Sequence, residues 1–222
     1  MTEISKIITP KNRLIFNYGD KSVTKYFRSR DEFDKELFIY EKRKDFAPEL
    51  LFYHKSELTI TMKMIDGITI VEQEKPDFEL LAALFYELHT MTEKTICLMD
   101  TNPRNFLFSP SQQKYFIIDF SDWRYEKKEF DLIHFLLFWA SLLEFEKFSF
   151  NTTIFLNEYE KLNSIDKSAW KNITEETIEI FDLRRNLHNK KEKKINKDLQ
   201  KNRLFIKNYS GFVKNIHRNL GG

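Results

Sequence analysis

The chain has 222 residues, which suits one domain or one domain of two lobes. Apolar residues make up 41% of it and 22 residues are Phe, a globular composition that excludes a disordered chain. The single cysteine, Cys97, excludes an internal disulfide, and the formal net charge is only +2.

The charge is unevenly distributed along the chain. The segment from Arg184 to Arg218 holds 12 Lys and Arg against two acidic residues, a net charge of +10, which leaves −8 for the rest. Three interpretations are open: a solvated helix face, attachment to an anionic membrane surface, or nucleic-acid binding. No stacking motif accompanies the basic residues, which makes nucleic acid the least expected partner.

Two features bear on the compartment. The N-terminus has no charged start followed by an apolar run, so we expect no signal peptide. The longest apolar stretch, Leu132 to Leu143, has 12 residues, whereas a membrane span needs about 20. We therefore expect a cytoplasmic protein, with the basic segment as a candidate for peripheral contact with the inner membrane face.

The first third of the chain reads mostly as strands. Short strands are expected over 4–8, 13–18 and 22–27, and two more over 49–53 and 58–64. Between these groups, Asp31 to Lys44 has apolar residues at helical spacing, with Asp31 as the expected N-cap. A turn at 65–67 ends this part of the chain.

The rest of the chain reads mostly as helix with a small β insert. A strong helix is expected over 78–90, and short β segments over 96–98, 106–108 and 115–119. Everything after Asp131 reads as helix. The order of elements predicts an α+β fold without internal repeats.

The polar loop between the β segments holds the candidate site. Asp100 and Asn105 lie on this loop, and Asp119 ends the apolar run Phe116 to Ile118. Loops at strand ends carry functional groups on a rigid scaffold. Two carboxylates and an amide are the oxygen ligands that Mg²⁺ accepts beside substrate phosphates. The alternative for the loop pair is an Asx-type turn that only closes the loop.

This loop resembles the catalytic loop of the protein-kinase-like superfamily, most closely that of small-molecule kinases and of lipopolysaccharide core kinases, which reads H/S-G-D-x-x-x-x-N-F/I-L. The resemblance implies a two-lobed α+β fold, with a β-rich N-lobe over 1–64, a hinge at 65–67 and a helical C-lobe over 68–222. It implies that Asp100 is the catalytic carboxylate. It also implies that Asn105 and Asp119 hold Mg²⁺.

Further segments match the same superfamily in order. Lys25 stands where the phosphate-contacting Lys belongs, and the resemblance pairs it with Glu36, or with Glu41 as a second candidate. The segment from Met62 through Met64 to Gly67 resembles the hinge whose backbone takes the adenine of ATP.

Asp131, in the sequence Glu-Phe-Asp-Leu, resembles the residue that caps a buried helix and braces the catalytic loop. We expect it to be a helix N-cap rather than a chemical group. His89 and His134 are expected to be satisfied core histidines, and Cys97 to be buried.

Three departures from the pattern stand out. The turn that should cover the phosphates has no glycines, and Lys11 or Arg13 would have to supply charge there. The usual His and Gly before the catalytic Asp are Leu98 and Met99. Asp119 is followed by Phe-Ser rather than Phe-Gly, which points away from regulated protein kinases.

The resemblance implies an ATP- and Mg²⁺-dependent transfer of a phosphoryl group to a hydroxyl. The expected acceptor is a sugar or glycolipid of the lipopolysaccharide core, as for heptose and Kdo kinases, or another small molecule, as for aminoglycoside and choline kinases. A small protein Ser/Thr kinase is an alternative. A pseudokinase that binds a partner without phosphoryl transfer is the non-enzymatic alternative, motivated by the missing glycines and by Leu98 and Met99.

Overall fold

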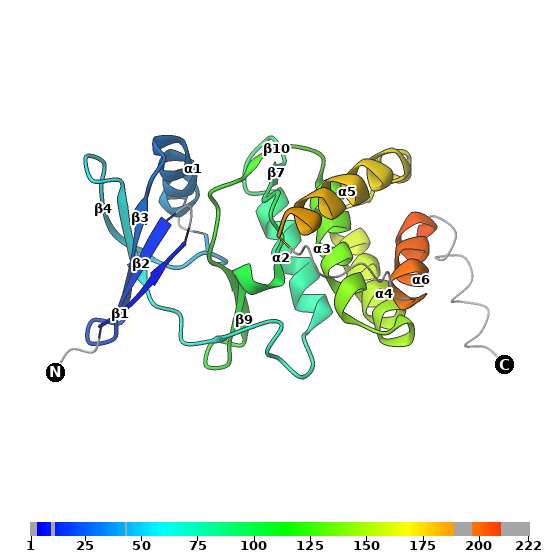
Figure 1. Cartoon of the computed structure of the whole chain (residues 1–222), viewed down its shortest axis with the longest axis horizontal. Helices are drawn as coiled ribbons and strands as arrows, with labels where there is room; N and C mark the ends of the chain where they lie inside the picture. The colour runs from blue at the N-terminus through cyan, green and yellow to red at the C-terminus, as the bar shows by residue number, and fades with distance from the viewer. Residues whose placement is uncertain (1–3, 10–11, 43, 189–196, 210–222) are drawn as a thin grey trace. The chain divides into compact units, whose positions relative to one another are not determined.

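The computed structural model describes residues 4–9, 12–42, 44–188 and 197–209 (Figure 1). These fall into two compact units, one formed by residues 1–76 and 103–123 and the other by 77–102 and 124–222. The segment 103–123, which the sequence interpretation placed in the C-lobe, therefore belongs to the same unit as the N-terminal strands.

A five-stranded antiparallel sheet with the order β1-β2-β3-β5-β4 dominates the first unit. Its strands are β1 (Ile4–Ile8), β2 (Asn12–Asn17), β3 (Ser22–Phe27), β4 (Leu50–His54) and β5 (Thr59–Lys63). Five of the predicted strands thus appear within one or two residues of their expected ends.

Helix α1 (Arg30–Glu41) packs against β3 and β5 through its buried face, which includes Phe33, Leu37 and Tyr40. The prediction that Asp31 caps this helix was wrong. Ser29 is the N-cap, because its backbone is extended and its hydroxyl accepts the N–H of Glu32, while Asp31 lies in the first turn.

A second, three-stranded sheet completes the first unit, with the order β6-β8-β9. It consists of β6 (Ile68–Thr69), β8 (Phe106–Ser109) and β9 (Lys114–Ile117), and the 3₁₀ turn η1 (Pro103–Asn105) leads directly into β8. The two-residue strand β6 was not predicted, because two residues carry no periodicity. Since β9 ends at Ile117, Asp119 lies just beyond a strand end.

Helices make up most of the second unit (Figure 1). They are α2 (Phe78–His89), α3 (Lys128–Leu142), α4 (Phe145–Leu162), α5 (Lys167–His188) and α6 (Lys197–Lys207), with the two-stranded pair β7 (Ile96–Cys97) and β10 (Arg124–Tyr125). Helix α2 packs on α4, and α3 packs on α5. The rings of Phe85, Phe135 and Phe155 lie 4.9 to 5.6 Å apart between centroids and form part of the aromatic core.

Helix α3 begins earlier than the sequence suggested. Its first residue is Lys128 and its N-cap is Lys127, so the prediction that Asp131 is the N-cap was wrong. Asp131 lies one turn into the helix, where its carboxylate accepts the backbone N–H groups of Leu98 and Met99 instead of capping the helix. In the described part of the chain, no helix is long and apolar enough to cross a membrane.

Candidate active site

A buried ammonium lies between two carboxylates in the first unit. Strand β3 positions Lys25, whose Nζ donates to Glu36 Oε2 at 2.7 Å and to Asp119 Oδ1 at 3.0 Å. Lys25 and Glu36 are 3% and 0% exposed, whereas the Asp119 side chain is 30% exposed. The structure therefore brings together three residues separated by up to 94 positions, and it pairs Lys25 with Glu36 rather than with Glu41.

Burial and charge act against each other in this triad. Burial raises the pKa of Glu36 to about 7, even though the Lys25 ammonium lowers it. Burial alone would lower the pKa of Lys25, but the two carboxylates raise it above its ordinary value, so the amine stays charged. Burial raises the pKa of Asp119, but Lys25 and the Ser121 N–H outweigh this and hold it below its usual range.

Asp119 and its surroundings fit a divalent cation. The carboxylate is ionised and partly exposed, and its Oδ1 also accepts the N–H of Ser121 at 3.2 Å. Asn105 lies beside it in the fold, because its backbone carbonyl accepts the N–H of Ile118 at 3.0 Å. A carboxylate and an amide on adjoining segments offer the few hard oxygen ligands that Mg²⁺ takes from a protein.

Asp100 belongs to the second unit. It is half-buried, and its Oδ1 accepts the N–H of Asn102 at 3.3 Å. This is the Asx-type contact that the sequence offered as an alternative. This contact involves one oxygen of the carboxylate, which stands at the start of a loop that ends at Asn105.

Asp131 holds the backbone just before Asp100. Its two oxygens accept the N–H groups of Leu98 at 2.6 Å and of Met99 at 3.0 Å. Asp131 is fully buried, so two charge-assisted hydrogen bonds satisfy a carboxylate that would otherwise be costly to bury. The expected brace of the loop is present, although the expected cap is not.

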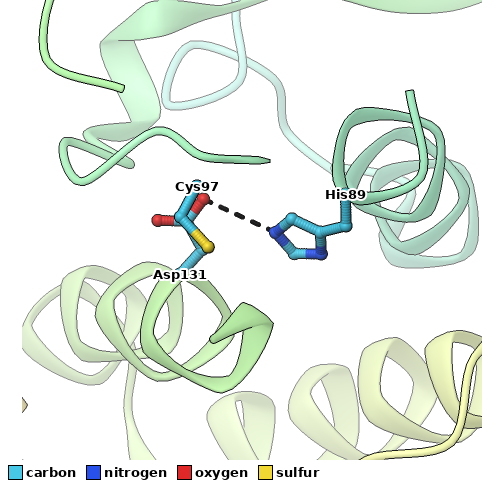
Figure 2. Close-up of side chains that lie close together, drawn as sticks. All are labelled: His89, Cys97 and Asp131. Carbon is cyan, nitrogen blue, oxygen red and sulfur yellow. Dashed lines mark ion pairs between the residues drawn. The ribbon is translucent and has the colours of Figure 1, made fainter. Parts of the chain in front are cut away.

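Figure 2 shows His89 and Cys97 beside Asp131. The three side chains offer ligand atoms within 4.8 Å of one another, as a metal site would require. These groups already have partners within the protein. The Cys97 thiol donates to the carbonyls of Glu126 and Lys127 at 3.5 and 3.4 Å, and the two Asp131 oxygens accept the N–H groups of Leu98 and Met99. Burial also raises the pKa of the Cys97 thiol.

His89 completes this buried layer. Its Nδ1 lies 2.7 Å from the Tyr159 hydroxyl, and its Nε2 lies 3.5 Å from Asp131 Oδ2. The cluster is therefore a polar support beneath the loop that carries Asp100. His89 and Cys97 have the buried positions that the sequence predicted.

The hinge that was expected to take adenine lies in the first unit. The Met62 side chain is buried, and its sulfur accepts the Tyr40 hydroxyl at 3.1 Å. The Met64 N–H donates to the Lys21 carbonyl at 2.7 Å, so an adenine would need a different backbone group of this segment.

The structure describes only one of the two cations that were expected over the phosphates. Arg13, on β2, lies with its guanidinium carbon 4.0 Å from the centroid of the Tyr26 ring on β3. Lys11 lies outside the described residues. Among the candidates of this turn, the structure therefore places only Arg13.

Two residues near Asp100 were not singled out as functional by the sequence. His134, on α3, contacts Thr101, and Arg184, on α5, contacts the backbone of Met99. The separations of 33 and 85 residues give no local signal. The basic run from Arg184 onward was visible, but its charge pointed to a surface role.

No protein-family model and no curated protein matches the sequence. Solved structures do match. The choline kinase LicA from Streptococcus pneumoniae has a TM-score of 0.63 at 15% identity over 91% of this chain and 90% of that chain. A choline/ethanolamine kinase family protein from Mesorhizobium loti has a TM-score of 0.62 at 9% identity over 92% of each chain.

An aminoglycoside phosphotransferase from Streptomyces rimosus has a TM-score of 0.56 at 9% identity over 73% of this chain and 86% of that chain. These neighbours are kinases of small molecules, and the expected architecture, a β-rich lobe and a helical lobe, is confirmed. The chain has the protein-kinase-like fold of the small-molecule phosphotransferases.

Proposed function

We propose that this protein is an ATP-dependent phosphotransferase that transfers the γ-phosphoryl group to a hydroxyl of a small molecule. The buried triad of Lys25, Glu36 and Asp119 is the observation that carries the proposal. Well-packed apolar residues often stabilise a protein at least as much as a buried ammonium–carboxylate pair does, so stability alone does not explain this triad. The presence of this triad in a fold shared with small-molecule kinases therefore favours a role in binding the nucleotide.

Each residue has a role in this proposal. Lys25, oriented by Glu36, binds the α- and β-phosphates as a fixed positive charge. Asp119 and Asn105 hold Mg²⁺, which neutralises charge on the phosphates when bound. Asp100 orients the acceptor hydroxyl and takes its proton as the oxygen bonds to phosphorus and ADP leaves.

The acceptor is proposed at two levels. The coarser proposal is a small-molecule alcohol, in keeping with neighbours described as choline, aminoglycoside and macrolide kinases. The finer proposal is a sugar or glycolipid of the lipopolysaccharide core, which rests on the Asp-x-x-x-Arg-Asn-Phe loop. In that case the basic segment would bring the protein to the anionic inner face of a membrane.

Calorimetry tests the nucleotide site. Wild type should bind ATP in the presence of Mg²⁺ and more weakly in EDTA, and Asp119→Asn should remove that metal dependence. Glu57→Gln is the control: it neutralises an exposed carboxylate that is not one of the proposed site residues, and it should bind ATP like wild type. A folded wild type that binds no ATP would refute the proposal and favour a scaffold without phosphoryl transfer.

Transfer is then tested with γ-labelled ATP and a panel of acceptors. The panel contains choline, ethanolamine, an aminoglycoside, Kdo and a heptose. Labelling of one acceptor that Asp100→Asn abolishes would establish the enzyme and its substrate class. ATP binding with neither transfer to an acceptor nor slow hydrolysis of ATP would instead support the pseudokinase.

A further inference from the structure

Met99, the residue directly before Asp100, has an unusual backbone conformation. Its φ is +64°, in the left-handed region that favours glycine, and its side chain is 4% exposed. The buried side chain packs in a cluster with Cys97 and Phe130. A strained residue at this position persists only if its surroundings hold it.

Both polar groups of Met99 are held. Its N–H donates to Asp131 Oδ1 at 3.0 Å, and its carbonyl accepts from Arg184 Nη1 at 3.0 Å. The first contact comes from α3 and the second from α5, a helix much later in the sequence. The orientation of the peptide between Met99 and Asp100 therefore depends on a guanidinium from α5.

Thr101, directly after Asp100, is held in the same way. The Thr101 hydroxyl lies 2.8 Å from His134 Nδ1, and its N–H points to the same nitrogen at 3.4 Å. Both residues are buried, at 0% and 1% exposure. A backbone N–H can only donate, so Nδ1 is an acceptor here and His134 is neutral with its proton on Nε2.

We propose that Arg184 and His134 are positioning residues for Asp100. They fix the peptides on its two sides and supply, from α5 and α3, a support for a loop that has Leu98 and Met99 in place of His and Gly. The inference rests on the proposed function for its catalytic part. Arg184, the first residue of the basic segment, is exposed, yet its guanidinium supports the loop through the Met99 carbonyl.

The first experiment compares Arg184→Met with Arg184→Lys and with Lys171→Met, an exposed basic residue of the same helix. Three quantities are measured: the Kd for Mg·ATP, the turnover of ATP with water as acceptor, and the hydrogen exchange of the peptide that spans residues 98–102. We expect Arg184→Met to lower turnover about tenfold, to leave Kd within about twofold, and to speed exchange. Arg184→Lys should restore part of both, and Lys171→Met should match wild type.

Thr101→Val provides a second variant that keeps the side-chain volume. It removes the hydroxyl next to His134 Nδ1 and should also lower turnover with little effect on Kd. Wild-type turnover and exchange in both Arg184→Met and Thr101→Val would overturn the inference, as would equal losses of turnover, ATP affinity and melting temperature. A wild type that turns over no ATP would refute the proposed function and the catalytic part of this inference, and the exchange data would then decide the support of the loop alone.

Discussion

Lys25 determines the electrostatic balance of the triad, because its ammonium separates two carboxylates. We expect Lys25→Met to lower the free energy of unfolding by about 3 kcal/mol at pH 8, since it leaves Glu36 buried without a counter-charge. The measurement is urea denaturation. Lys63→Met, which removes a cation 60% exposed in a surface pair with Glu49, should cost less than about 1 kcal/mol.

The pH dependence of that loss has a defined sign. The pKa of Glu36 is raised in the folded state, so the protonated carboxyl favours folding, and this contribution is lost as the pH rises through the folded pKa. Removing Lys25 raises that pKa further. The destabilisation should therefore be smaller at pH 5 than at pH 8, and an equal loss at both would show that Glu36 is not the unpaired charge.

Gly67 is required by a close approach of two backbones. A Cβ at this position would lie 2.5 Å from the carbonyl oxygen of Phe108. Backbone atoms cannot move aside cheaply, so Gly67→Ala should destabilise the protein by about 1–3 kcal/mol. Gly19→Ala, in an exposed turn, is the control, and equal melting temperatures for the two variants would contradict the prediction.

Residues with a strong local context could be identified from the sequence. Local context alone was enough to single out three residues: Lys25 on a strand, Glu36 on the next helix and Asp119 after an apolar run. The N-cap at Ser29 and the inner position of Asp131 could not be assigned, because several polar residues stand near each helix start. Thr101, His134 and Arg184 meet only through tertiary packing, which no spacing in the sequence reveals.

At the scale of elements, α6 closes the C-terminal end of α3. Asn202 is fully buried, and its Nδ2 donates to the carbonyls of Ala140 and Leu143 at 3.0 and 2.9 Å. These carbonyls are among those that a helix end leaves without partners. We expect Asn202→Ala to cost about 1–3 kcal/mol, measured by urea denaturation, while Gln200→Ala on the exposed face of α6 should cost little.

Helix α3 also contains a pH-dependent group. Burial lowers the pKa of His134 from 6.5 to about 4, with Asp131 opposing the shift and Arg184 adding to it. Since the unfolded state binds the proton first, this contribution to stability is complete above about pH 6.5 and is lost as the pH falls toward 4. It amounts to at most about 3 kcal/mol.

The test compares the pH dependence of unfolding in wild type and in His134→Gln. Both chains contain the same acidic residues, so the difference between their curves reports His134. Wild type should lose more stability between pH 6.5 and 4 than the variant. Parallel curves would mean that His134 is protonated in the folded state or exposed to water.

Strong periodicity made the longer elements predictable. Helix α2 and the strands of the five-stranded sheet match their expected ranges closely, since apolar residues repeat at the spacing of their structure. Strands β6 and β10 have two residues each and form only because neighbouring segments pair with them. The β9 prediction ran past Ile117 because the apolar run continues beyond the ladder.

For the whole molecule, the sequence predicted the fold class but not the grouping of segments. The sheet of β6, β8 and β9 joins residues 68–69 to residues 106–117, so the chain passes between the two units three times. A linear division at 64–67 cannot express this. The two units are defined by contacts between segments that are distant in the sequence, and the amino-acid composition does not reveal such contacts.

The structure also changes the view of the basic segment. Arg203 pairs with Asp182, and Lys207 pairs with Glu175, so part of its charge is neutralised within the second unit. Lys190, Lys191, Lys193 and Lys194 lie outside the described residues. A role of the segment at a membrane would therefore depend chiefly on cations that the described contacts do not use.

The proposed membrane contact can be tested on those four lysines. At about 1 kcal/mol for each cation near an anionic surface, replacing all four with Gln should weaken binding to phosphatidylserine vesicles by roughly 10²–10³-fold. Binding of wild type should fall as NaCl rises from about 0.1 to 0.5 M, because the Debye length shortens. Vesicles of phosphatidylcholine alone are the control, and Mg·ATP binding should be unchanged in the variant. Equal vesicle binding by wild type and variant would leave the segment as a solvated and partly paired surface.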